Sequence, residues 1–173
     1  AADRITAFAL FAFFLFLYLY TCSHNPNIAG DSPELIAGPY SLGILHPPGY
    51  PLYTLLGYLF SHLPVGSVAF RMNFTSVIFH SLTLLLLFVS AMKITRNRIA
   101  ASIAVAVLGF SSLFWFYAQV AEVFPLNSLF AVLLIYVAIR SREEWVLGNR
   151  SSSLKRFLLL SFLAGLSLTH HHT

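Results

Sequence analysis

Residues 30–51 hold the side chains of this chain that are best suited to acid–base chemistry. Asp31 and Glu34, two of the six acidic residues in the sequence, are followed by His46 within the same stretch. A carboxylate can accept a proton from an attacking hydroxyl group, and a nearby histidine can stabilise the charge that develops on a leaving group. Because only 9% of the residues are charged, we interpret this stretch as an active-site loop with Asp31 and Glu34 as catalytic candidates.

The same residues also have structural interpretations. In residues 31–34 the aspartate can cap a short helix and the glutamate can close a capping box, and that helix would end at residues 38–39. In residues 46–51 the prolines predict a rigid turn, in which His46 either contacts a substrate or stabilises the turn by a hydrogen bond. A carboxylate can cap a helix and still react, so both interpretations stay open for Asp31.

Two more candidates lie outside this stretch, in segments that the expected topology brings to the same side of a membrane. Arg71 precedes an apolar run and is either a phosphate clamp or a cation that snorkels to the membrane interface. Glu122 lies in a short connection and is either a substrate contact or a solvated turn residue. We expect both to bind substrate.

The elements that must position these side chains are membrane-spanning helices. Hydrophobic residues make up 58% of the chain, its mean hydropathy is +0.78, and the apolar residues form long runs. We therefore expect an all-α integral membrane protein with a single membrane domain over residues 1–173. Five transmembrane helices are expected near residues 5–22, 68–92, 99–118, 123–139 and 154–169, and an outer loop over residues 23–67.

The outer loop contains a fourteen-residue apolar segment, residues 50–63, which is too short to span and predicts a re-entrant or interfacial helix. With that segment not crossing, nine of the ten Lys and Arg residues fall on one side, which the positive-inside rule makes cytoplasmic together with the N-terminus. Asp31, Glu34, His46 and Glu122 then share the outer side with Arg71.

Cations that lie in short clusters between apolar runs do not predict a nucleic-acid surface. Histidine and cysteine spacing predicts no metal site.

Five motifs carry a resemblance to a known family. They are residues 30–34 (GDSPE), 42–53 (LGILHPPGYPLY), 69–73 (AFRMN), 121–127 (AEVFPLN) and 168–173 (LTHHHT). Together they resemble the N-terminal part of multi-pass membrane proteins that are grouped with protein O-mannosyltransferases of the GT-C type. The chain therefore looks like a truncated part of a longer protein.

The resemblance implies a glycosyltransferase that moves a mannose-like sugar from a polyprenyl-phosphate donor to an acceptor hydroxyl, such as Ser or Thr of a protein or a glycan. It places an essential acid at Asp31, and it adds Tyr50, Asn127 and His171, which lie within the motifs, to His46, Arg71 and Glu122 as substrate-binding candidates. The expected location is a bacterial inner membrane or the endoplasmic reticulum. A multi-pass transporter and a noncatalytic membrane subunit are the alternatives.

Overall fold

A computed structural model describes residues 2–28 and 30–170 of the chain. Within these residues the protein is all-helical, as predicted, and contains no strand. The helices are α1 (Ala2–Thr21), α2 (Ser32–Ser41), α3 (Pro51–Ser61), α4 (Val68–Thr95), α5 (Arg98–Gly109), α6 (Ser112–Ala118), α7 (Phe124–Val146) and α8 (Arg150–Leu168).

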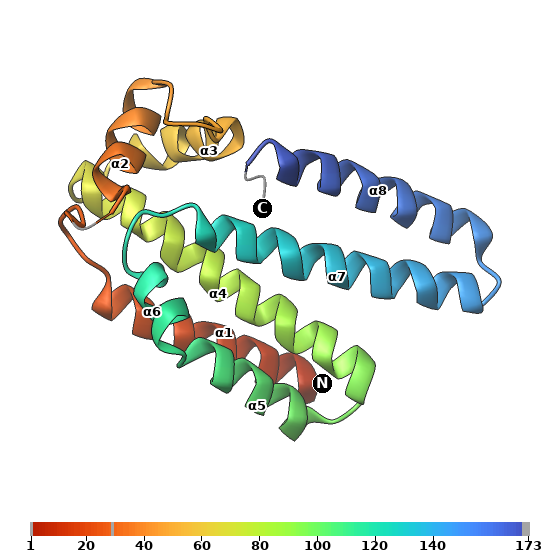
Figure 1. The fold of residues 1–173 in the computed structure, drawn as a ribbon. Helices are drawn as coiled ribbons and strands as arrows, with labels where there is room; N and C mark the ends of the chain where they lie inside the picture. The colour runs from red at the N-terminus through yellow and green to blue at the C-terminus, as the bar shows by residue number, and fades with distance from the viewer. Residues whose placement is uncertain (1, 29, 171–173) are drawn as a thin grey trace.

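Helix α4 lies at the centre of the bundle. It packs against α1 and α5 on one side and α7 on the other, and α8 lies along the far side of α7 (Figure 1). The short helices α2 and α3 pack on each other and on α4, and they cover the end of the bundle where α4 begins (Figure 1). Residues from the first loop, the α6–α7 connection and the end of α8 therefore meet at this end.

In the described part of the chain, three helices are long and apolar enough to cross a membrane: α1, α4 and α7. A fourth crossing results only if α5 and α6 are counted together, although they are bent by 68° at their junction. The expected fifth span corresponds to α8, which runs antiparallel to α7 but is not among the helices that meet this criterion. Its first turns carry Arg150, Lys155 and Arg156, which lower its mean hydropathy.

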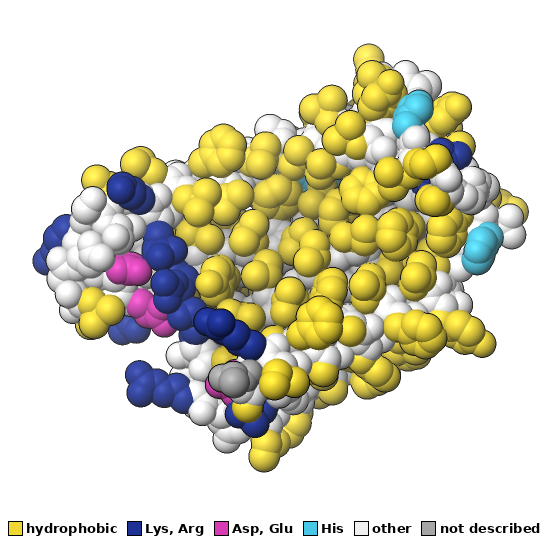
Figure 2. Space-filling view, turned by 180° about the vertical axis from the view of Figure 1, so that it is seen from behind, with side chains coloured by type: hydrophobic (Ala, Val, Ile, Leu, Met, Phe, Trp, Pro, Cys, Tyr) yellow, Lys and Arg dark blue, Asp and Glu magenta, His cyan; other side chains and the backbone are white. Residues whose placement is uncertain are grey.

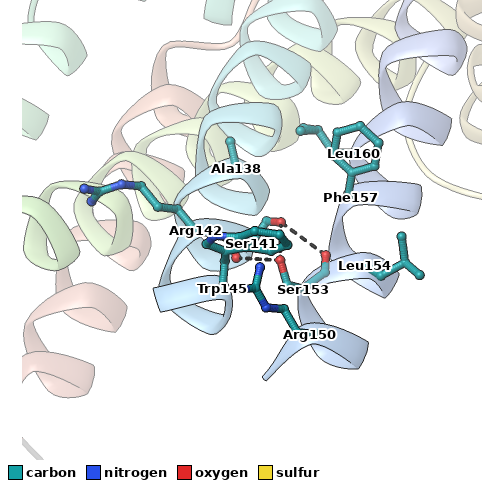
Figure 3. A pocket seen from close by; sticks show the side chains of 9 residues that line it. All are labelled: Ala138, Ser141, Arg142, Trp145, Arg150, Ser153, Leu154, Phe157 and Leu160. Atoms are coloured by element: carbon teal, nitrogen blue, oxygen red, sulfur yellow. Dashed lines mark hydrogen bonds between the residues drawn. The ribbon is translucent and has the colours of Figure 1, made fainter. Parts of the chain in front are cut away.

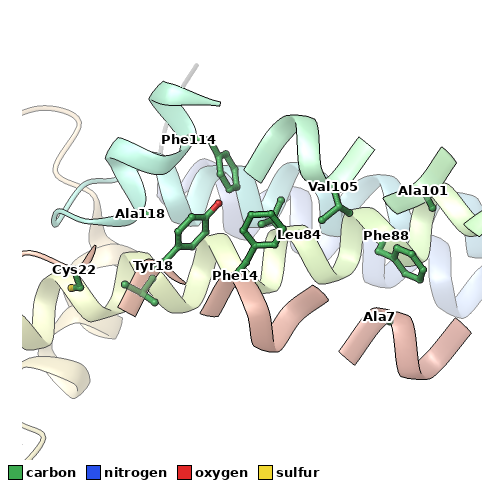
Figure 4. Close-up of a cluster of buried hydrophobic side chains, with 11 residues drawn as sticks. Ala7, Phe14, Tyr18, Cys22, Leu84, Phe88, Ala101, Val105, Phe114 and Ala118 are labelled. Atoms are coloured by element: carbon green, nitrogen blue, oxygen red, sulfur yellow. The ribbon is translucent and has the colours of Figure 1, made fainter. Parts of the chain in front are cut away.

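The expected span over residues 99–118 is broken after Gly109, a residue that makes close contacts with α1. At the last residue of α5, Gly109, the ring of Phe14 lies so close that an added Cβ would be 2.4 Å from its Cε1 atom. The hydroxyl of Tyr18 donates a hydrogen bond to the Gly109 carbonyl at 2.7 Å. Both α1 side chains belong to the buried cluster between α1, α4, α5 and α6 (Figure 4).

Charged side chains gather at the opposite end of the bundle from α2 and α3. In Figure 2 the Lys, Arg, Asp and Glu side chains concentrate at one end, and hydrophobic side chains cover the middle of the visible face. Ion pairs join Asp3 to Arg98 at 2.7 Å and Lys93 to Glu143 at 2.9 Å, so they tie α1 to α5 and α4 to α7. We call this the basic end, and the end that carries α2 and α3 the site end.

Candidate active site

The first loop folds into two short helices joined by a turn, and prolines set where each helix begins. Pro33 lies in the first turn of α2 and Pro51 is the first residue of α3, where the missing N–H costs no hydrogen bond. Tyr50, immediately before α3, has a left-handed backbone with φ 44° and ψ 53°. This conformation is strained for a residue with a side chain, so surrounding contacts must hold Tyr50 in place.

A two-point contact joins the two parts of this loop. The backbone N–H of His46 donates to Oε1 of Glu34 at 2.7 Å, and the ring Nδ1–H donates to Oε2 at 2.7 Å. These hydrogen bonds favour the charged forms of both partners, so the pKa of Glu34 lies below its usual value and the pKa of His46 lies above it. Glu34 therefore orients the imidazole and favours its charged form.

The other ring nitrogen of His46 faces two polar groups. Its Nε2 atom lies 3.2 Å from the hydroxyl of Tyr50 and 3.8 Å from Oδ2 of Asp31. The Asp31 side chain is 64% exposed, so its carboxylate is accessible to an incoming substrate. Asp31, Glu34, His46 and Tyr50 thus form one connected group.

Residues 31–34 begin a helix with Pro33 in its first turn, as predicted, but the side-chain hydrogen bonds of the capping interpretation are not made. Asp31 stands at the N-cap position of α2, but its side chain makes no capping hydrogen bond. Glu34 does not reach back to close a capping box because its two oxygens are occupied by His46. Helix α2 also continues through Gly38 and Pro39 to Ser41, beyond the expected end.

Glu122 joins this group from the α6–α7 connection. The residue is 7% exposed, and burial, followed by the negative charge of Asp31, raises its pKa to about 7. Its Oε1 atom lies 3.4 Å from where a Cβ on Gly30 would stand, so the loop that carries Asp31 passes directly over it. A carboxyl group with this pKa can donate a hydrogen bond at neutral pH when protonated.

Asn73, which we did not expect at the site, holds these two segments together. Its side-chain amide donates to the carbonyls of Ser23 at 2.8 Å and Asn25 at 3.1 Å, in the loop that leads to Asp31. Its side-chain oxygen accepts the N–H of Ala121 at 2.7 Å, next to Glu122. Asn73 lies in one of the five motifs, residues 69–73, and its place in that motif was the sequence feature that could have indicated its role.

The end of α8 contributes His170, which was also missed as a site residue. His170 is 1% exposed, and its Nε2–H donates to the carbonyl of Val123 at 2.9 Å. The ring stacks on Tyr53 with centroids 6.1 Å apart and lies 6.4 Å from Tyr50. It therefore packs against Tyr50 and Tyr53, at the start of α3. The predicted candidate His171 lies outside the described residues.

Arg71 and Asn127 are not brought into this group. The Arg71 guanidinium donates to the carbonyls of Ser61 at 2.6 Å and Leu63 at 2.7 Å, where α3 ends. Eleven residues of α3, about 16 Å, separate that point from Tyr50. Asn127 lies in the first turn of α7, and no hydrogen bond or ion pair within residues 2–28 and 30–170 joins its side chain to Asp31 or Glu122.

A mostly apolar cavity of about 480 Å³ lies beside the His46 turn. Its walls are residues 42–44 and Gly49 of the turn, together with Pro51, Thr54 and Leu55 of α3. A cavity of this size and lining can hold part of a hydrocarbon chain next to polar groups. In the described part of the chain, no cluster of three His, Cys, Asp or Glu side chains could hold a metal ion.

Comparisons with known proteins agree with the motifs. A family model described as "Protein O-mannosyl-transferase TMEM260 N-terminal domain" matches residues 31–173. The mouse protein O-mannosyl-transferase TMEM260 is 41% identical over 145 residues, which cover 83% of this chain and 20% of the mouse protein. A Dictyostelium discoideum protein O-mannosyl-transferase tmem260 is 29% identical over 165 residues, which cover 90% of this chain and 20% of that protein. The chain thus spans about one fifth of the length of these relatives. No solved structure is significantly similar to it.

Proposed function

This chain belongs to the family of the protein O-mannosyl-transferase TMEM260 N-terminal domain, and on this premise we propose that it carries the acid–base site of a membrane mannosyltransferase. The donor is a polyprenyl-phosphate-linked mannose, and the acceptor is a Ser or Thr hydroxyl of a protein. The enzyme belongs to the GT-C type. No nucleotide-binding loop is needed for such a donor.

The observation that carries this proposal is the group of Asp31, His46 and Glu34 beside an apolar cavity. The exposed Asp31 carboxylate accepts the proton of the acceptor hydroxyl as that oxygen bonds to the anomeric carbon of the sugar. The bond between this carbon and the donor phosphate breaks, and its electron pair leaves with the phosphate oxygen. Protonated His46 stabilises the phosphate, and the cavity along α3 holds the first isoprene units of the lipid.

The charge states of the group suit an anionic donor. Three carboxylates around one phosphate would repel it, but two features reduce this repulsion. The hydrogen bond that His46 donates to Glu34 keeps His46 positively charged to higher pH, and burial keeps part of Glu122 protonated near neutral pH. Protonated Glu122 then donates a hydrogen bond to a sugar hydroxyl or a phosphate oxygen.

We propose that this group lies at one membrane face, because it stands where several helices of the bundle end. We propose that the basic end is cytoplasmic, as the positive-inside rule requires, and that the N-terminus lies there. The site end then faces the lumen of the endoplasmic reticulum in a eukaryote, or the outer side of a bacterial inner membrane. Donor and protein acceptor meet on that side.

The decisive experiment replaces Asp31 by Asn in the full-length protein and measures mannosyl transfer from a labelled polyprenyl-phosphate donor. Loss of a general base lowers the rate by about 10² to 10⁴-fold. Asp3→Asn is the matched control, since it removes the same carboxylate at the basic end, where Asp3 pairs with Arg98. Near-normal transfer by Asp31→Asn would remove Asp31 from the role of base. Equal losses in both variants would show a general effect of the substitution.

A further inference from the structure

A cavity lies at the basic end, far from the carboxylates of the site end. It lies between the C-terminal half of α7 and the N-terminal half of α8 and has a volume of about 480 Å³. Ala138 and Trp145 of α7 and Leu154, Phe157 and Leu160 of α8 form its apolar walls (Figure 3).

Two serines that are hydrogen-bonded to each other line the polar end of this cavity. The hydroxyl of Ser153 donates to the carbonyl of Ser141 at 3.0 Å, and the hydroxyl of Ser141 donates to the carbonyl of Ser153 at 3.2 Å. These bonds hold α7 and α8 together beside Trp145 and Arg150, and the apolar side chains Phe157 and Leu160 lie further along α8 (Figure 3). The cavity is therefore polar at its mouth and apolar along its length, like a phospholipid.

Arg150 is fixed at this mouth. Its guanidinium carbon lies 3.4 Å from the centroid of the Trp145 ring, so the cation stacks on the indole face. A stacked guanidinium keeps its N–H donors at the edge of its plane, where they can grip two oxygens of one phosphate. Trp145 is 57% exposed, and aromatic side chains of this kind are enriched where a membrane meets water.

The charge balance around this cavity favours an anion. Nine Lys and Arg residues lie at the basic end against the three acids Asp3, Glu143 and Glu144, which leaves a net charge of +6. All three acids already pair with other cations, namely Arg98, Lys93, Arg140 and Arg156. Within residues 2–28 and 30–170, Arg150 has no acidic partner and is available to a phosphate group.

We propose that the cavity between α7 and α8 is a binding site for an anionic phospholipid, whose phosphate binds Arg150 and whose acyl chain lies against Phe157 and Leu160. If the basic end is cytoplasmic, as proposed above, the site faces the leaflet in which anionic lipids are concentrated. The site is separate from the sugar-transfer group and would anchor the α7–α8 pair at a defined depth in the membrane.

Binding of dioleoyl-phosphatidylserine and dioleoyl-phosphatidylcholine to the purified full-length protein, measured by native mass spectrometry, tests this proposal. One cation near an anionic lipid is worth about 1 kcal/mol, so Arg150→Gln should weaken phosphatidylserine binding about fivefold. Arg4→Gln is the matched control, because it removes another cation of the basic end that has no acidic partner in the described chain. We expect it to change this binding less than twofold.

A second variant tests the apolar part of the cavity independently of charge. Ala138→Phe fills the space between the helices, so it should weaken binding of dioleoyl-phosphatidylserine and leave binding of dihexanoyl-phosphatidylserine unchanged. Three outcomes would overturn the proposal: equal affinity for the two dioleoyl lipids, an equal loss in Arg4→Gln and Arg150→Gln, or displacement of the lipid by inorganic phosphate at equal concentration. The last outcome would identify a phosphate site without a lipid.

Discussion

Both oxygens of the Glu34 carboxylate are bound to one residue, His46, through its backbone N–H and its ring Nδ1–H, each at 2.7 Å. This contact joins residues twelve positions apart and places the opposite ring nitrogen, Nε2, between Tyr50 and Asp31. The imidazole of His46, which lies 3.8 Å from Asp31, is thus positioned by a second acid, Glu34. Glu34 itself need not touch the substrate.

Glu34→Gln should shift the pH dependence of transfer. The Glu34 carboxylate raises the pKa of His46, so charged His46 persists to higher pH than an ordinary histidine would. Without the carboxylate this pKa falls. As the pH rises, the variant should therefore lose the activity that needs charged His46 at a lower pH than the parent does. Profiles of kcat/KM against pH for both proteins check this. An alkaline limb that stays in place would show that His46 acts without its charge.

Glu122→Gln should flatten the pH dependence of stability. The pKa of Glu122 is about 7 in the folded protein against an ordinary value of 4.5. The folded state therefore holds the proton more tightly, and stability is lost as the pH rises from about 5 to 8. Glutamine cannot ionise, so thermal unfolding in detergent should show a higher Tm for the variant than for the parent at pH 8 and a similar Tm at pH 5. Parallel curves would contradict the buried position of this carboxyl.

Asn73→Ala should reduce both stability and transfer. It leaves the buried Ala121 N–H without its acceptor, which costs about 1–3 kcal/mol, and it removes the donor that ties the carbonyls of Ser23 and Asn25 to α4. Asn97→Ala is the control, because Asn97 caps α5 at the basic end and its loss costs about 1 kcal/mol of stability only. Comparison of Tm and kcat for the two variants separates a positioning role from a general loss of stability.

Gly57→Val should disrupt the packing of α3 under the site. A Cβ at Gly57 would stand 2.7 Å from Cε of Met72 and 2.7 Å from Cβ of Pro39, so α3 could no longer approach α2 and α4. Overpacking of this kind typically costs about 1–3 kcal/mol. Gly165→Val, in a helix where no atom lies within 4 Å of the added Cβ, is the matched control. If both variants melt at the same temperature, close packing at Gly57 is not needed.

The sequence predicted the starts of helices better than their interruptions. Pro51 and the apolar run after it indicate the short helix α3, because proline in the first turn and a length below one span are both local signals. The break after Gly109 was not predicted. Gly109 at the end of α5 and Ser111 before α6 are weak local signals inside an apolar run, and the contacts of Gly109 with Phe14 and Tyr18 join residues about 90 positions apart.

The candidate site was predictable to the same extent. The expected topology brought Glu122 to the end of the bundle that carries Asp31, and the two lie close enough for their charges to interact. The pairing of Glu34 with His46 was not predicted, since the acid at the third position after Asp31 matches a capping box. Arg71 was expected at a phosphate because it alone among the Lys and Arg residues was predicted on the outer side. Its N–H groups instead bind the nearby carbonyls of Ser61 and Leu63.

The amide of Asn73 has a consequence for how Asp31 and Glu122 are coupled. It binds the segment before Asp31 and the segment before Glu122 from one helix, α4. A shift of α4 at Asn73 would therefore move both segments together, so the distance between the two carboxyl groups is set by one side chain.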